Sequence, residues 1–147
     1  MTLKSFGIVL ALVVLVQPAY SKIFTGPARL ANTDIAAIRN VIVGQFEAFR
    51  HDDAEKAFSF AAPKIKKIFG TPEAFLRMVR ETYQAVYRPK TYRFRDIERI
   101  NDQLVQPVTV VGPSGITEKA LYIMEIQPDG SWRIGGCIMA QKPGDET

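Results

Sequence analysis

The stretch RPKTYRFRDI, residues 88–97, marks a change in the period of the apolar residues. Before Pro89 they recur at steps of three and four, which is typical of helices. From Thr91 onward apolar and polar residues alternate, which is typical of a strand. Pro89 separates the two because proline does not continue a helix. Helices followed by strands predict an α+β domain in which a curved antiparallel sheet wraps the helices.

The predicted helices lie between residues 33 and 88. The first has one apolar face, made of Ile35, Ile38, Ile42, Phe46 and Phe49. We expect Asn32 or Thr33 at its N-cap, because their short polar side chains accept hydrogen bonds from the first turn. A short second helix follows the charged residues 50–53, and Asp52 with Glu55 resembles a capping box at its start.

Two further helical segments precede Pro89. Residues 63–69 form a turn of helix that ends at Gly70, a residue typical of helix C-termini. The next helix begins with Thr71 at its N-cap and Pro72 at its first position. We expect it to continue to Pro89. Its inner face would be formed by Phe75, Met78, Val79, Tyr83 and Val86.

The second half of the chain contains four apolar segments separated by turn residues: 91–97, 103–111, 119–127 and 131–140. The last three predict a meander of antiparallel strands. Pro107 lies inside the second segment, which argues for an edge strand or a bulge. The third segment is apolar on both faces, so the face turned away from the helices needs cover. A second subunit packed against this face is the simplest way to cover it.

The last segment contains the pair Gly135-Gly136, which predicts a bulge or a close approach by a neighbouring element. If the strand is regular, Cys137 shares a face with Arg133, and Trp132 shares the other with Ile134.

The N-terminus predicts an exported protein. One basic residue precedes an apolar run over residues 6–16. Residues 19–21 then place small residues at the third and first positions before a cut, as signal peptidase requires. We therefore expect a signal peptide over 1–21 and a periplasmic or secreted protein with no membrane span after cleavage. We divide the rest of the chain into three parts: a lead-in over 22–32, a single domain over 33–141 and a tail over 142–147.

The composition excludes several classes of site. The chain has one cysteine and one histidine, which rules out an intramolecular disulfide and does not supply the ligands of a zinc site. Nucleotide and nucleophile motifs do not occur in it either. We expect no metal and no cofactor. Cys137 is expected to be a small packing residue rather than a nucleophile, because no cation lies near it to lower its pKa.

Basic residues concentrate in the middle of the chain. From Lys64 to Arg99 there are ten basic and four acidic residues, a net charge of +6, interleaved with aromatic side chains. Because an exported chain does not meet nucleic acid, an acidic small molecule or an acidic envelope partner fits this charge better. The alternative is that these residues form ordinary solvated faces.

The order of HDDAEKAFSFAAPKI (51–65), FGTPEAFLRMVRETYQAVYRP (69–89) and DGSWRIGGC (129–137) resembles a secreted bacterial family of unknown function numbered four-eight-six-four. More distantly, the chain is similar to the nuclear-transport-factor-like superfamily, which includes SnoaL-like and ketosteroid-isomerase-like proteins. The resemblance implies a cone fold, a pocket between sheet and helices, and a homodimer packed through the sheet. It does not imply an activity.

Three functional hypotheses follow. The third of them is a cone filled by side chains, which binds no ligand and serves only in protein interactions. The first is a non-enzymatic domain that binds a small molecule or an acidic partner. Its candidate ligand-binding residues are Tyr83, Tyr87, Arg88, Arg93, Trp132 and Cys137. The second is a cone-fold enzyme that moves a proton on a hydrophobic small molecule. Its candidate catalytic residues are Tyr83, Asp53 and His51.

Overall fold

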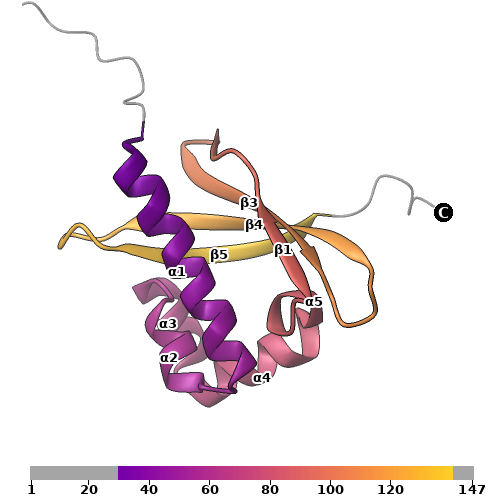
Figure 1. Ribbon diagram of the computed structural model, residues 1–147. Coiled ribbons are helices and arrows are strands. Elements are labelled where there is room, and N and C mark those ends of the chain that lie inside the picture. Colours follow the sequence, from indigo (N-terminus) through magenta and orange to yellow (C-terminus); the bar gives the residue numbers. More distant parts are fainter. Residues whose placement is uncertain (1–29, 141–147) are drawn as a thin grey trace, which may run out of the picture.

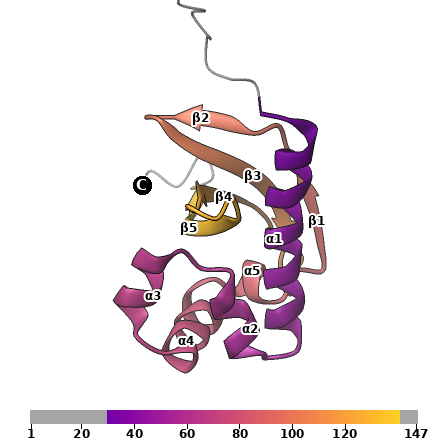
Figure 2. The same cartoon turned by 90° about the vertical axis from the view of Figure 1, so that its left-hand side faces the viewer.

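The computed structural model describes residues 30–140 (Figures 1 and 2). Its helices are α1 (Asn32–Arg50), α2 (Ala54–Ser59), α3 (Pro63–Phe69), α4 (Pro72–Thr82) and α5 (Gln84–Tyr87). Its strands are β1 (Thr91–Phe94), β2 (Glu98–Ile100), β3 (Gln103–Val111), β4 (Thr117–Ile126) and β5 (Trp132–Ala140). This order confirms the α+β prediction. The expected signal peptide and tail lie outside the described residues, as does most of the lead-in.

All strand pairs of the sheet are antiparallel, in the order β1-β3-β4-β5, with β2 also paired to β3. The predicted meander of β3, β4 and β5 is confirmed. The single strand expected over 91–97 is wrong, because the chain leaves the sheet after Phe94 and returns at Glu98. β1 pairs with residues 108–111 of β3 and β2 with residues 103–105.

The edge position expected for Pro107 is also wrong. Pro107 lies in β3, which has neighbours on both sides, and falls between the segments paired with β1 and β2. The buried Gln106 side chain fills this gap. Its amide nitrogen donates to the carbonyls of Arg95 (2.7 Å) and Pro107 (2.8 Å), and its oxygen accepts from Arg39 (3.2 Å). At this gap the Gln106 side chain makes hydrogen bonds in place of those that a neighbouring strand would make.

The predicted bulge in β5 is confirmed. The register shifts so that Ile123 pairs with Gly136 but Met124 pairs with Ile134, which leaves Gly135 without an opposite residue. The bulge reverses the alternation of the strand, so the faces expected for a regular strand are wrong. Cys137 pairs with the buried Tyr122, and the next residue, Ile138, is 54% exposed.

The long helix α1 packs beside the sheet, while α2, α3 and α4 lie below β4 and β5 in Figure 2. As expected, Ile38, Ile42, Phe46 and Phe49 are buried, although Ile35 is only half-buried. The expected cap at Asn32 or Thr33 is wrong, because Asn32 is already the first residue of the helix. Its N-cap is Ala31, which has no side chain to accept a hydrogen bond.

The continuous helix expected up to Pro89 is interrupted at Tyr83. The backbone there has φ −120° and ψ 53°, outside the helical region, so α4 ends at Thr82 and α5 begins at Gln84. This turn brings Ala85 against Gly112, where an added Cβ would lie 3.1 Å from the Ala85 Cα. The interruption therefore docks α5 on the end of β3. None of the helices in the described part of the chain is long and apolar enough to cross a membrane.

Replacement of Gln106 tests the link between β1, β2 and β3. Gln106→Leu should lower the free energy of unfolding by about 2–4 kcal/mol, because it leaves buried hydrogen-bonding groups without a partner. Urea unfolding followed by circular dichroism measures this change. The matched control is Gln103→Leu in the same strand, where the side chain is exposed, with an expected change of about 0.5 kcal/mol or less. Equal effects of the two substitutions would contradict this account.

Candidate functional site

A cavity of about 280 Å³ lies between the helices and the inner face of β4 and β5. Its wall is mainly apolar. Phe75, Met78 and Val79 of α4 form one side, and Ile65 and Ile68 of α3 form another. Ile68 is 64% exposed, so this side of the cavity reaches the molecular surface. An apolar cavity with few polar groups is the usual form of a small-molecule site.

The sequence explains why α3 borders the cavity without filling it. The helix is short, begins at Pro63 and ends at Gly70, where φ is 74°. None of its residues is buried. The connection from α2 to α3 is tied to β5, because the Ala62 amide donates to the Ile134 carbonyl (2.8 Å) and the Ile134 amide to the Phe60 carbonyl (2.9 Å). This tie fixes the distance between the helices and the sheet at the cavity.

Four side chains give the cavity its polar groups: Gln45, Tyr83, Tyr122 and Cys137. Gln45 on α1 is buried and donates to the Ala57 carbonyl (3.1 Å). Tyr122 projects from the middle of β4, and its ring packs edge-on against Phe46 with centroids 6.0 Å apart. The Tyr122 hydroxyl is buried and contacts the Cys137 thiol, a weak acceptor, but no group among the described residues makes a hydrogen bond of good geometry with it. The Tyr122 side chain is 0% exposed, so its hydroxyl lies behind the open surface of the cavity.

Cys137 lies beside Tyr122 as its cross-strand partner and is half-buried. Burial raises the pKa of the Cys137 thiol to about 12, an effect that the neighbouring Tyr122 hydroxyl partly opposes. Burial also raises the pKa of the Tyr122 hydroxyl well above its usual value, and the adjacent Cys137 adds to the rise. Both groups are therefore uncharged at neutral pH.

The residues that line the cavity include no Asp, Glu, His, Lys or Arg within the described part of the chain. A carboxylate or imidazole base of the kind expected for proton transfer is thus not among them. Within residues 30–140, His, Cys, Asp and Glu side chains nowhere gather in the group of three or more that would hold a metal ion.

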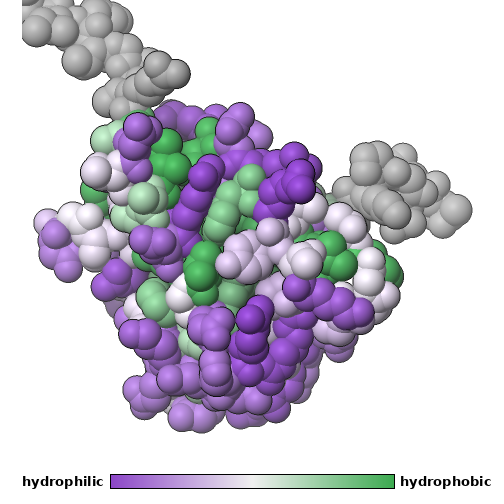
Figure 3. Space-filling view, in the orientation of Figure 1, coloured by the Kyte–Doolittle hydropathy of each residue, from purple (hydrophilic) through white to green (hydrophobic). Residues whose placement is uncertain are grey.

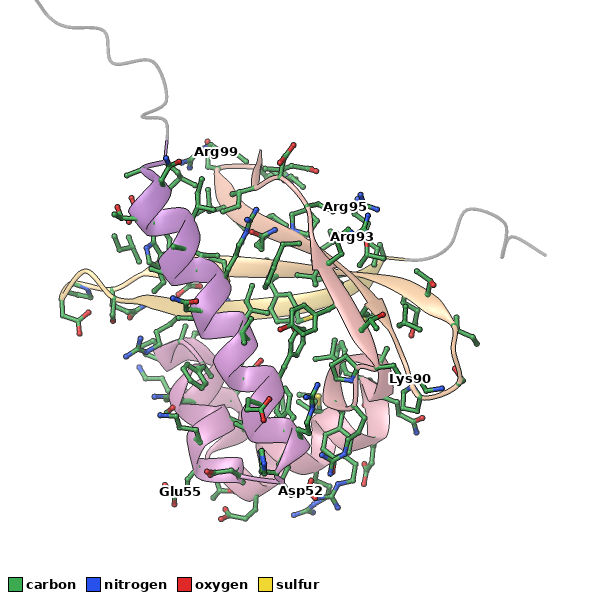
Figure 4. The ribbon with its side chains drawn as sticks, in the orientation of Figure 1. Asp52, Glu55, Lys90, Arg93, Arg95 and Arg99 are labelled. Atoms are coloured by element: carbon green, nitrogen blue, oxygen red, sulfur yellow. The ribbon has the colours of Figure 1, made fainter. Side chains whose placement is uncertain are left out.

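Several sequence-based candidates lie instead at the C-terminal end of α1, at the bottom of Figure 4. Arg88 donates to the Phe49 carbonyl (2.8 Å) and to the Asp52 carboxylate (2.9 Å), and it also bonds the Arg50 carbonyl. Tyr87 donates to the same carboxylate. The Tyr87 hydrogen bond, then the charges of Arg88 and Arg80, lower the pKa of Asp52. Figure 3 shows this end of the molecule as mainly hydrophilic.

This cluster closes α1 rather than forming a pocket with the cavity. Asp53 caps α2 by accepting from the Lys56 amide (2.9 Å), so the capping residue is Asp53 and not Asp52 as in the expected capping box. His51 is exposed and its ring lies against the Glu47 carbonyl (2.9 Å). Carbonyls at a helix C-terminus attract cations such as the Arg88 guanidinium.

The remaining candidates are separated from one another. Trp132 is buried at the start of β5 and donates to Asp34 on α1 (3.3 Å). Arg93 is exposed on β1 and lies beside Arg95, with Lys90 and Arg99 farther away in opposite directions (Figure 4). Of the six predicted ligand-binding residues, Tyr83 and Cys137 line the cavity. Sequence reasoning missed Tyr122 and Gln45, although an apolar strand containing one tyrosine was a signal for the first.

The raised pKa of Cys137 predicts that its thiol reacts slowly with alkylating reagents. At pH 8 the native protein should react with iodoacetamide about a thousandfold more slowly than the unfolded protein, because the thiolate fraction falls tenfold for each unit of pKa. Mass spectrometry over time, with and without urea, measures both rates, and the single cysteine makes the site unambiguous. Native labelling at the unfolded rate would contradict an uncharged native thiol.

Comparison with known proteins places the chain in a family. Residues 31–147 match the family described as a domain of unknown function, DUF4864. No curated protein and no solved structure matches the chain. Since the match covers most of the sequence, including every described helix and strand, the chain belongs to the DUF4864 family.

Proposed function

We propose that this protein is an exported, non-enzymatic domain that binds a small apolar molecule in the cavity between its helices and its sheet. The observation that carries the proposal is the cavity itself, with its apolar wall and its few polar groups. The apolar run over residues 6–16 supports export. The arrangement of sheet and helices supports a cone fold of the nuclear-transport-factor-like kind.

The competing enzyme function has less support. Of its three candidate catalytic residues, only Tyr83 lines the cavity. Asp53 is exposed and caps α2, and His51 lies on the surface. Proton transfer at neutral pH needs a group whose pKa lies near 7. The burial that raises the pKa of Tyr122 and Cys137 moves both away from that range.

Binding to an acidic partner would use a different surface. Lys90, Arg93, Arg95 and Arg99 are exposed along β1, β2 and their connection (Figure 4). Two acidic residues, Asp96 and Glu98, are exposed in the same segment and reduce its charge. This surface therefore has a weaker electrostatic preference than the count of basic residues over 64–99 suggests.

The cavity proposal is tested with N-phenyl-1-naphthylamine, an uncharged dye that fluoresces in apolar surroundings. The wild-type protein should give a saturable rise in fluorescence. Met78→Trp should lower the affinity about tenfold or more, because the larger side chain fills space in the cavity wall. The control is Arg77→Trp, which adds the same side chain at the neighbouring, exposed position.

Thermal unfolding establishes that both tryptophan variants are folded at the temperature of the titration. Equal dye affinity for the wild type and Met78→Trp would show that the dye binds outside the cavity. No saturable signal from the wild-type protein would overturn the proposed function.

The outer face of the sheet supports a homodimer. Leu121 and Ile123 of β4 are half-buried there, and Ile138 of β5 is largely exposed. Along β4 this apolar centre lies between Lys119 and Glu125, which point to the same face. A two-fold axis that lies between two facing sheets, parallel to them and perpendicular to β4 at the level midway between Leu121 and Ile123, would place Lys119 of one copy opposite Glu125 of the second. The face is thus self-complementary, as a two-fold interface requires.

Charge reversal tests this dimer. Lys119→Glu should shift the protein from dimer to monomer, because it places two carboxylates opposite each other at both ends of the interface. The double variant Lys119→Glu/Glu125→Lys restores opposite charges and should restore the dimer. Light scattering coupled to size exclusion measures the mass. A monomeric wild type, or a double variant no more dimeric than the single one, would contradict this interface.

A further inference from the structure

The helix α3, which borders the open side of the cavity, carries three lysines and no acidic residue. Three of its seven residues line the cavity, and three of the others are Lys64, Lys66 and Lys67. Within residues 30–140, none of these lysines forms an ion pair with a carboxylate. Their positive charges are therefore available to a ligand that reaches the helix.

Two of the lysines lie beside the opening of the cavity. Ile68 lines the cavity and is 64% exposed, so it marks the opening. Lys64 is exposed four residues before Ile68, and side chains at this spacing share one line on the surface of a helix. Lys67 is the exposed neighbour of Ile68 on the solvent side. Lys66 instead lies over the Phe58 ring of α2, 6.0 Å from its centroid.

The other elements around the cavity do not cancel this charge. On α4, Arg77 and Glu81 are exposed beside the lining residue Met78, and their opposite charges offset each other. On β5, the lining residues Gly136 and Cys137 are uncharged. The lysines of α3 therefore make the opening positive.

The cavity and its opening favour different parts of a ligand. A dry apolar cavity of about 150 Å³ binds benzene, so the 280 Å³ found here suits an apolar group of about ten carbon atoms. A charged group would lose its hydration inside, because the lining offers no opposite charge. At the opening a polar group keeps its contact with water while the apolar part is buried. The positive opening selects a negative group at that end.

We propose that the cavity binds single-chain amphiphiles with an anionic head group. The apolar chain lies in the cavity, and Lys64 and Lys67 attract the head group at the opening beside Ile68. This inference rests on the proposed small-molecule function and specifies the ligand class. The apolar wall supplies affinity for the chain, and the two lysines distinguish an anionic head group from a cationic or uncharged one.

The test uses three probes with the same ten-carbon chain: decanoate, decylamine and 1-decanol. At neutral pH their head groups are negative, positive and uncharged. Each competes with N-phenyl-1-naphthylamine, below its critical micelle concentration, for the wild-type protein and for Lys64→Glu/Lys67→Glu. The double variant should weaken decanoate about fivefold or more, tighten decylamine by a similar factor and leave 1-decanol within about twofold. The opposite signs matter, because a change in cavity shape would move all three probes in the same direction.

The matched control is Lys90→Glu/Arg93→Glu, which makes the same change in net charge at two exposed positions. Both residues lie at β1 (Figure 4), on the opposite side of the molecule from α3 (Figure 2). At an ionic strength of about 0.15 M charges are screened within about 8 Å, so this variant should bind all three probes as the wild type does. At about 1 M salt the wild-type preference for decanoate over decylamine should shrink.

Thermal unfolding checks that both double variants are folded, as expected for substitutions of solvent-accessible side chains. The neutral variant Lys64→Gln/Lys67→Gln gives a second measurement. It removes the two charges without reversing them, so it should weaken decanoate by a smaller factor and again leave 1-decanol unchanged.

The outcomes separate the two proposals. Equal changes for decanoate and decylamine in Lys64→Glu/Lys67→Glu, or equal effects of this variant and its control, would overturn the inference and leave the cavity function intact. Failure of the three amphiphiles to displace bound dye would overturn it as well. Loss of binding to phosphatidylglycerol vesicles in the lysine variant, with decanoate affinity unchanged, would assign the lysines to a lipid surface and also overturn it. Absence of dye binding would instead remove the proposed function on which the inference rests.

Discussion

The join between the α2–α3 connection and β5 determines the rest of the structure. Two backbone hydrogen bonds tie residues 60–62 to Ile134, one residue before the bulge at Gly135. They hold the helices against one edge of the sheet, and the bulge turns Cys137 toward Tyr122. Gly44 permits this join, since an added Cβ there would lie 2.6 Å from the Phe60 ring. The cavity exists because these contacts hold α3 near the sheet without burying any of its residues.

Two groups of charged side chains lie away from the cavity. The ionic cluster of Asp52, Arg80 and Arg88 closes the end of α1, and the exposed arginines follow β1 and β2. Among residues 30–140, the side chains that line the cavity are uncharged. Hydrogen bonds from guanidinium to helix carbonyls stabilise the helix end locally. The basic segment that dominates the sequence therefore has structural uses in part.

Local signals in the sequence predicted local structure well. Thr71, Pro72 and Gly70 occupy the expected capping positions because caps depend on neighbours within four residues. Predictions that needed the partner element were less successful. Pro107 looked like an edge residue, yet it lies where β3 has a gap between two partners, a fact set by the path of residues 95–97. The helix expected to reach Pro89 ends early, because α5 docks on Gly112.

The sequence by itself determined the order of helices and strands, the meander and the bulge, since periodicity and glycine placement are read from adjacent residues. It also limited the chemistry, because a single histidine and a single cysteine leave few reactive groups. Only the tertiary structure decided which polar side chains share a cavity. Tyr122, Cys137 and Gln45 come from β4, β5 and α1, and their place around one cavity depends on the register of two strands and the position of a helix. No local pattern encodes that arrangement, because it arises from packing between segments distant in the chain.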